Sequence, residues 1–522
     1  MNRFIVVLAF VMIAGAGSAA PAGATTFCVP GFHSECPDNG TNVSEPDLQT
    51  AMNTNADDRK EDRIVLDTRT YVDPDSFTAT GTDILWIEGG GSTLTSSSAS
   101  GTYVTDFPGG KTVNLQDLKI VIPASFPDGT GGGARVGHGE LLRVDIESRN
   151  PGATGFTTAP FGSIEQSHIY GAEGGDLKFG VNTQAGEPGT AQLIGTLVED
   201  AEYAVASDNP DGAINLFSSR LRPSGFGIWS TGGAGVDIQN SLIEAGDEPA
   251  VFYREGAGRG VGARMWNSTI VGDDDSARPA LDYATEGSPG TSMYALIMDS
   301  IIWGFDVPYV LRAPAKRTGE SIELSIQGSN VKRTGGVTKG NVYKEPPVGQ
   351  TYADPMFARD RFGNYTYRLS PGSPSIDSGT SIVQIETDLA GEPRPVDGNG
   401  DGVAWQDQGA FEFQPGRDHR APKITSAEFV DRRPSRSAPF VRFSLSERSD
   451  VRVTLRPVPL KRDGKRRKAF RVSGKFRGPG RVKLRFWPAP GAGRYNLFIR
   501  ATDPAQNIAY RQLKVRVTKP KR

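Results

Sequence analysis

One short segment near residue 400 has the spacing of a calcium loop. Side-chain oxygens recur at its first, third and fifth positions, and Gly402 at the sixth position allows a sharp turn. The twelfth position is Gln408 instead of the usual Glu, which excludes a regular EF-hand. The alternative is a plain Asx turn that holds no metal. The pattern predicts a structural calcium site with these ligands: Asp397, Asn399, Asp401, the carbonyl of Val403, and Asp407.

Few residues have the types and spacing of a catalytic site. The motif Gly137-His138-Gly139 is similar to the Gly-His-Gly of polygalacturonases, but the Asn-Thr-Asp element of those enzymes is missing. Asp273–Asp275 follows a strand pattern and could do acid–base work, or hold calcium near Arg254 or Arg264. The alternative is a solvated acidic turn. The catalytic residues therefore stay unknown at this stage.

The charge of the chain is divided between two unlike parts. The formal net charge of −2 is the sum of a basic part and an acidic part. Residues 417–522 contain 30 Lys+Arg and 7 Asp+Glu, whereas residues 1–416 contain 28 Lys+Arg and 53 Asp+Glu. Such a split predicts two domains with different surfaces, joined near Pro415. The basic run Lys461–Lys468 predicts a hairpin or loop that binds an anionic polymer, and the alternative is a solubilising surface. Its proposed anion-binding residues are Lys461, Arg462, Lys465, Arg466, Arg467 and Lys468.

A repeated phrase in the middle of the chain predicts how these residues are positioned. Apolar residues alternate over about five positions, a small polar residue follows, and then a Ser or Thr. The Ser/Thr recurs at residues 167, 196, 219, 241, 268, 300 and 329. The shortest spacing fits one coil of a parallel β-helix, in which equivalent positions stack on one another. A β-sandwich or a propeller is the rival fold, although a propeller would have a longer and more regular period.

The stacked positions have different predicted roles. Aliphatic residues should point inward, and the small polar residues should occupy a bend because they tolerate a left-handed backbone. The inward set is Leu216, Ile238, Met265, Ile297 and Ile326, and the bend set is Ser218, Asn240, Asn267 and Asp299. The variable segments between copies are expected to be loops that border a groove. A short amphipathic helix at 46–52 would cover the open end of the stack.

The first residues have the features of a secretory signal peptide. Arg3 is followed by the apolar run Phe4–Ala16, and Ala22-Gly23-Ala24 is a small-residue cleavage site, so residues 1–24 are expected to be removed. An N-terminal membrane anchor is the alternative, and no later segment is apolar enough to span a membrane. Export permits a disulfide between Cys28 and Cys36, whereas two free buried thiols are the alternative.

The segment 350–415 carries an ordered string of motifs. It contains Ala353–Phe357, Pro371–Pro374, Thr387–Pro395 and Gly409–Phe413. Together with the repeats, this string resembles the bacterial secreted right-handed parallel β-helix proteins of the choice-of-anchor Q type. The resemblance covers about three quarters of the chain. It implies a pectate-lyase-like fold and an extracellular or surface location, often associated with carbohydrate.

The last hundred residues have the alternation of short strands that is typical of a β-sandwich. Apolar positions alternate with arginines such as Arg442, Arg452 and Arg500. The segment 493–507 resembles the closing strands of bacterial immunoglobulin-like domains, although the cysteine pair of that family is missing. The expected fold is therefore all-β: a β-helix over residues 25–415, with residues 350–415 at its end, and a basic sandwich over residues 416–522.

Two functions follow from these expectations. The preferred one is a secreted or surface-associated β-helix protein that binds polysaccharide or acts in adhesion, with a basic domain that attaches to anionic polymers. The alternative is a polysaccharide lyase or glycoside hydrolase acting on an acidic polysaccharide. A cluster of carboxylates with an arginine near Asp237, Asp273–Asp275 or Asp299 would favour the alternative. A monomer is expected, with calcium as the one cofactor considered.

Overall fold

The computed structural model describes most of the chain. The described residues are 24–54, 60–79, 84–100, 102–129, 131–172, 175–183, 189–255, 262–285, 290–314, 319–332, 336–359, 364–380, 385–415, 422–430, 439–446, 449–458, 461–462, 465–466, 469–476, 480–486, 490–502 and 508–518. The expected signal peptide lies outside them, apart from Ala24. Within the described residues, no helix has the length and apolar character that a membrane span requires.

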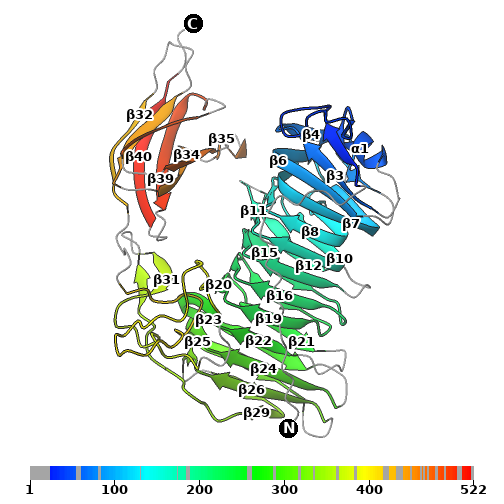
Figure 1. Ribbon diagram of the computed structural model, residues 1–522. Helices are drawn as coiled ribbons and strands as arrows, with labels where there is room; N and C mark the ends of the chain where they lie inside the picture. The colour runs from blue at the N-terminus through cyan, green and yellow to red at the C-terminus, as the bar shows by residue number, and fades with distance from the viewer. Residues whose placement is uncertain are drawn as a thin grey trace.

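Strands β1 to β29 form one parallel β-helix, as the repeated phrase predicts (Figure 1). Each coil contains three strands, and each strand pairs in parallel with its counterpart in the next coil. We call the three sheets A, B and C, in the order in which the chain meets them after each variable loop. An all-β chain with a parallel β-helix followed by a small antiparallel sandwich is confirmed.

The strands fall into the three sheets as follows. Sheet A contains β1 (Thr26–Val29), β2 (Val43–Ser44), β3 (Glu61–Leu66), β13 (Thr190–Ile194), β16 (Ala213–Phe217), β19 (Gly235–Gln239), β22 (Ala263–Trp266), β24 (Ser292–Met298), β26 (Ser321–Gln327) and β29 (Val342–Lys344). Sheet B contains β4 (Thr70–Asp73), β9 (Asp145–Ser148), β11 (His168–Gly171), β14 (Leu197–Glu199), β17 (Arg220–Arg222), β20 (Leu242–Glu244) and β27 (Asn330–Val331). Sheet C contains β5 (Phe77–Thr78), β12 (Leu177–Thr183), β15 (Ala201–Ser207), β18 (Phe226–Ser230), β21 (Val251–Glu255) and β28 (Val337–Lys339). Long strands that pass from one sheet to the next are β6 (Ile84–Ser96), β7 (Tyr103–Ile122), β8 (Gly132–Leu142), β10 (Thr154–Glu165), β23 (Thr269–Thr285) and β25 (Ile301–Arg312).

Sheet C corrects one expectation from the sequence. The segments between the repeated phrases were expected to be loops, yet each of them contains a strand of this sheet. The strands of sheet C share no repeated sequence pattern, because their outward residues differ from coil to coil. The β-helix also begins earlier than the repeats, since β1 already pairs in parallel with β3.

The bend between sheets A and B is built as the sequence predicts. Ser218, Asn240, Asn267 and Asp299 all have positive φ, between 46° and 50°. The hydroxyl residue that follows each bend links neighbouring coils: the backbone N–H of Ser219 donates to Oγ of Ser241 at 3.1 Å. The same bond repeats along the stack from Thr196 to Ser329. Buried backbone donors at every bend are thereby satisfied.

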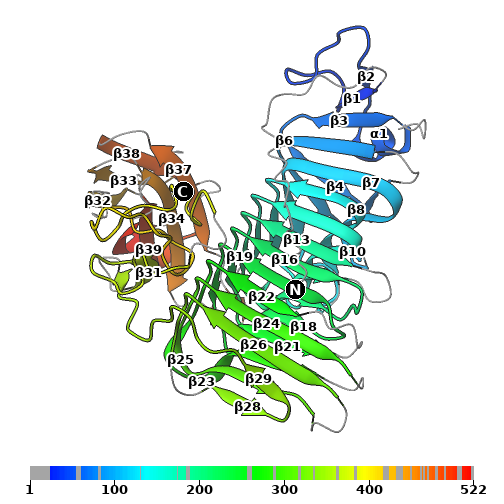
Figure 2. The same ribbon diagram turned by 60° about the horizontal axis from the view of Figure 1, so that its bottom comes forward.

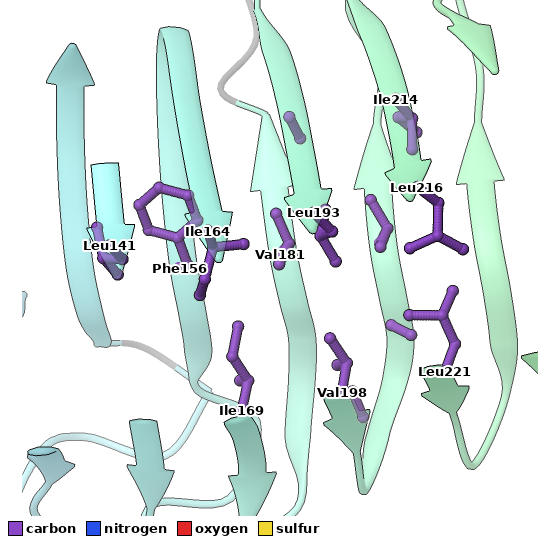
Figure 3. Packing of buried hydrophobic residues seen from close by; sticks show 14 of the residues in the cluster. Leu141, Phe156, Ile164, Ile169, Val181, Leu193, Val198, Ile214, Leu216 and Leu221 are labelled. Atoms are coloured by element: carbon purple, nitrogen blue, oxygen red, sulfur yellow. The ribbon is translucent and has the colours of Figure 1, made fainter. Parts of the chain in front are cut away.

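The interior is a continuous apolar column. Figure 3 shows Leu216 and Leu221, from sheets A and B, among the buried side chains that fill it. Four of the five predicted inward residues are at most 3% exposed, and Ile326, in the last full coil, is partly buried. Each such side chain contributes about 1.5–3 kcal/mol on burial. The helix α1 (Leu48–Thr54) closes the first coils by burying Leu48, Ala51 and Met52.

Residues 345–415 follow the last coil and fold back over sheet B. They contain the pair β30 (Phe357–Arg359) and β31 (Tyr365–Leu369), which packs with Ile376, Phe411 and Phe413 against Leu242, Val271 and Ile301. Arg394 lies at the centre of this segment with no exposed surface, and it pairs with Glu412 at 2.9 Å. The segment thus brings its own apolar and ionic core to one face of the β-helix.

The remaining strands form a sandwich of two antiparallel sheets. One sheet has the order β32 (Ile424–Val430), β33 (Phe440–Leu445), β38 (Gly480–Arg485). The other has the order β37 (Phe470–Phe476), β34 (Ser449–Val458), β39 (Gly493–Thr502), β40 (Ile508–Val517). A separate hairpin joins β35 (Lys461–Arg462) to β36 (Lys465–Arg466). Figures 1 and 2 both show the sandwich beside the β-helix.

Candidate functional site

The outer surface of sheet C carries a row of half-buried aromatic rings, which we call the aromatic stripe. It runs across four successive coils, because Phe179, Tyr203 and Phe226 are register partners and so are Trp229 and Phe252. Tyr203 stacks between Phe179 and Phe226 with centroid distances of 5.2 Å on both sides. On the same strands as these rings, Val181, Val205, Ile228 and Val251 are fully buried in the apolar column. The stripe is therefore held on a rigid surface.

Trp229 and Phe252 extend the stripe toward the later coils. Trp229 meets Tyr203 edge-on at 5.8 Å and stacks parallel to Phe252 at 6.5 Å. A contiguous apolar patch on a surface is a common sign of a binding site. Aromatic rings suit sugars because the C–H groups on one side of a sugar ring pack against them, while polar groups at the edge can bond to hydroxyls.

A charged cluster ends the aromatic stripe. The guanidinium of Arg254 lies 3.7 Å from the ring centroid of Phe252 and pairs with Asp282 at 2.9 Å. Arg312 lies on the coil that follows the coil of Asp282, and it also pairs with this carboxylate. Arg254 and Asp282 are nearly buried, whereas the side chain of Arg312 is 39% exposed. Two guanidiniums therefore share the carboxylate of Asp282 beside the rings.

The outer surface of sheet B carries a different set, a ladder of ion pairs. Lys119 pairs with Glu147 at 2.6 Å, and Tyr170 donates its hydroxyl to the same carboxylate at 3.0 Å. His168 lies on the same strand as Tyr170 and stacks on its ring, with the centroids 4.4 Å apart. The imidazole of His168 also contacts Glu199 of the next coil at 2.9 Å. Arg222 then bridges Glu199 and Glu244. Glu147 and Glu199 are on alternate coils, about 10 Å apart along the axis.

The ladder fixes the ionisation of its carboxylates. Burial alone would raise the pKa of Glu147, but hydrogen bonds from Lys119 and Arg149 outweigh it and lower the pKa to about 2. Burial likewise opposes ionisation of Glu199, yet His168 and Arg222 lower its pKa to about 2. Burial raises the pKa of Tyr170, so its hydroxyl keeps its proton near neutral pH. Both carboxylates are therefore charged acceptors.

The acidic residues around which a catalytic cluster would have favoured an enzyme lie in separate surroundings. Asp237 is held by Arg264 in a bidentate pair on sheet A, with N–O distances of 2.6 and 2.5 Å. Asp299 is fully buried at its bend and accepts hydrogen bonds from the N–H and hydroxyl of Thr380. Asp273 is exposed, and the side chains of Asp274 and Asp275 lie outside the described residues. His138 is exposed on sheet A.

The predicted calcium ligands occupy a compact exposed turn. Asp397 accepts hydrogen bonds from the N–H groups of Gly400 and Gly402, and Asp401 accepts one from Val403. Asn399 accepts from Asp401 in the same turn. In contrast, Asp407 is buried and accepts the N–H groups of Asp377 and Phe413. In the part of the chain that is described, no three His, Cys, Asp or Glu residues form a group that could hold a metal. The calcium site remains a prediction.

The other predicted sites have separate outcomes. Cys28 and Cys36 form a disulfide, which confirms that pairing. The backbones of Lys461, Arg462, Lys465 and Arg466 form the predicted hairpin, and their side chains lie outside the description. Arg467 and Lys468 are also outside the described residues. Anion binding by this hairpin remains a prediction.

The aromatic stripe escaped the sequence analysis although a signal was present. Phe179, Tyr203, Phe226 and Phe252 recur at spacings close to one coil, but they lie in segments that were taken for loops. The ion ladder was missed for a related reason. Four of its residues lie three positions after the Ser or Thr of a repeat, outside the alternating aliphatic positions, and two others precede the first repeat. The four are Tyr170, Glu199, Arg222 and Glu244, and the two are Lys119 and Glu147.

Comparison with known proteins adds little to this geometry. No family model matches the chain, and no curated protein matches it. A solved structure that is similar is the enzymatically active domain of tailspike protein 2 of bacteriophage CBA120, at 10% identity. The match covers 87% of this chain and 72% of that chain, with a TM-score of 0.21. A likeness at this TM-score carries no argument about fold or function.

Proposed function

We propose that this chain is a secreted or surface-associated protein that binds a polysaccharide along the aromatic stripe of sheet C. The stripe itself is the observation that carries the proposal. Five rings form a continuous band across four coils, over a length of about 15 Å, on a surface that the buried column behind it keeps rigid. The band consists of two adjacent register columns, Phe179–Tyr203–Phe226 and Trp229–Phe252. A linear polymer of sugar rings is a ligand that matches a band of apolar rings.

The Arg254–Asp282–Arg312 cluster would orient that polymer. A guanidinium at the end of an apolar line can donate hydrogen bonds to sugar hydroxyls or to a carboxylate. Stacking of Arg254 on Phe252 leaves the more exposed Arg312 as the group that meets the ligand. We therefore expect the protein to prefer polymers that carry acidic sugars over neutral ones.

Affinity electrophoresis tests this proposal on the full mature chain. Gels contain polygalacturonate, alginate or a neutral galactan, and the buffer contains about 1 M salt, where the Debye length is about 3 Å and diffuse attraction is screened. We expect retarded migration in at least one acidic polymer under these conditions. Unchanged mobility in every gel would contradict the proposal.

The ion ladder on sheet B supports a second candidate, a polysaccharide lyase. Glycoside hydrolysis by two carboxylates needs one that is protonated, and Glu147 and Glu199 both have a pKa of about 2. A lyase instead needs a base and an acid such as His168 and Tyr170, with cations such as Lys119 or Arg149 near the uronate. Release of unsaturated ends that is lost in Tyr170→Phe would favour this candidate.

A further inference from the structure

The outer face of the four-stranded sheet in the sandwich is almost entirely cationic. Along β34, Val451, Val453 and Leu455 point inward and are at most 2% exposed, so the residues between them point outward. The cross-strand registers place outward residues of β37, β39 and β40 on the same face. Its cations are Arg452, Arg456, Arg471, Arg494, Arg500, Lys514 and Arg516. All are exposed except Arg500, which is half-buried.

Several of these cations are held directly opposite one another. Arg452 is the register partner of Arg500, and Arg494 is the partner of Arg516. Like charges in such positions destabilise a sheet, by a few tenths to about 1 kcal/mol for each pair. In the described part of the sandwich, no ion pair joins these seven cations to an acidic side chain, and Asp450 is the acidic residue on this face. From the β-helix, Asp200 lies within electrostatic reach of Arg471, and Arg220 lies within reach of Arg500. An anionic ligand bound on this face would offset that cost.

The two rings on the face indicate which polyanion it fits. The guanidinium of Arg456 lies 5.3 Å from the centroid of Phe498, and that of Arg500 lies 6.0 Å from the centroid of Tyr510. Single-stranded nucleic acids bind largely by stacking bases on accessible rings. Because guanidiniums already cover these rings, the face offers charge and hydrogen bonds more than stacking. Carboxylate or sulfate groups on a sugar chain need only those.

We infer that this face is a binding site for a linear acidic polysaccharide, with the Arg452–Arg500 pair at its centre. The site goes beyond the aromatic stripe and is independent of it. It also differs from the Lys461–Lys468 hairpin, which lies in a separate two-stranded sheet. A chain with one polysaccharide site on the β-helix and a second on the sandwich could link two polymers.

Three variants of the full mature chain test the inference, each with two charges removed. R452Q/R500Q changes the proposed site, R442Q/R481Q changes the other sheet of the sandwich, and K339Q/K344Q changes two exposed lysines in the last coils of the β-helix. The probe is immobilised heparin at low salt. We expect R452Q/R500Q to weaken binding about tenfold and each control by no more than about twofold. Equal weakening by all three would mean that only net charge matters, and would overturn the inference.

Measurements of the melting temperature and of oligo(dT) binding complete the test. We expect R452Q/R500Q to keep or raise the melting temperature at low salt, because a like-charge pair has been relieved. If that variant fails to fold, R494Q/R516Q replaces it with the same expected loss of binding. Tighter binding of oligo(dT) than of heparin would overturn the choice of ligand. R452Q/R500Q leaves the aromatic stripe unchanged, so it should keep wild-type retardation by polygalacturonate at about 1 M salt, and failure of one site does not imply failure of the other.

Discussion

The side chain of Asn240 donates a hydrogen bond at 3.1 Å to the carbonyl of Thr387, 147 positions later in the chain. The next two bends repeat this relation. Asn267 donates to Oε1 of Gln406 at 3.0 Å, and Asp299 accepts the hydroxyl of Thr380 at 2.9 Å. The bend residues therefore do two things, since they reverse each coil and also anchor the segment that covers sheet B.

Asn267→Ala should destabilise the protein for both reasons. The substitution places alanine at a φ of 46° and removes the buried partner of Gln406. We expect the free energy of unfolding to fall by about 2–4 kcal/mol, from the strained backbone and the unsatisfied amide. Urea denaturation followed by circular dichroism measures the change.

Asn267→Gly separates the two contributions. Glycine accepts the left-handed backbone, so this variant should recover about 1 kcal/mol relative to Asn267→Ala while the amide bond stays lost. Equal stability of the two variants would show that the backbone conformation of the bend is not what selects asparagine.

The ion ladder should make the protein sensitive to acid. Glu147 and Glu199 have pKa values of about 2 in the folded state, against 4.5 for an ordinary Glu. A depressed folded pKa adds stability above the unfolded pKa, and that stability is lost as the pH falls from about 5 to 2. Each pKa unit is worth about 1.4 kcal/mol. Denaturation at several pH values should show this loss.

Comparison with Glu147→Gln and Glu199→Gln isolates the effect. Each variant should be less stable than the wild type at pH 7 and approach it near pH 2. The comparison also removes the opposite contribution of Asp407 and Glu412, because burial raises the pKa of both carboxyl groups. Glu323→Gln on sheet A is the matched control. A difference from the wild type that is independent of pH would contradict the account.

The exposed turn at Asp397–Asp401 makes a specific prediction about calcium. Titration calorimetry should detect binding of one calcium ion, and calcium should raise the melting temperature. D397N/D401N should abolish both effects, because it removes the two carboxylates of the exposed turn. Asp407→Asn is expected to destabilise the segment even without calcium, since its carboxylate accepts two backbone N–H groups. No heat of binding in the wild type would reject the site.

The sequence predicts most of the β-helix because its bends repeat a chemical requirement. Only a few residue types tolerate positive φ, so Ser218, Asn240, Asn267 and Asp299 marked the bends correctly. The tail strands were also predictable, since buried Val453 and Leu455 alternate with exposed arginines. In these elements one local rule decides the structure.

The candidate sites were harder to predict, because they depend on which coils lie side by side. Phe179 and Phe252 are 73 positions apart, and only the stacking of coils brings them into one stripe. The same holds for Glu147 and Glu199 on sheet B. No local pattern reports the register of strands whose connecting loops vary in length.

Binding by a variant of the aromatic stripe tests the central claim most directly. The dissociation constants for polygalacturonate are compared between the wild type, W229A/F252A, and the control Y294A/Y343A, which removes two exposed rings from sheet A. Loss of two rings should weaken binding at least tenfold, at about 1–3 kcal/mol per ring, with little change in the control. Equal dissociation constants for the wild type and W229A/F252A would contradict the claim that polysaccharide binds along sheet C.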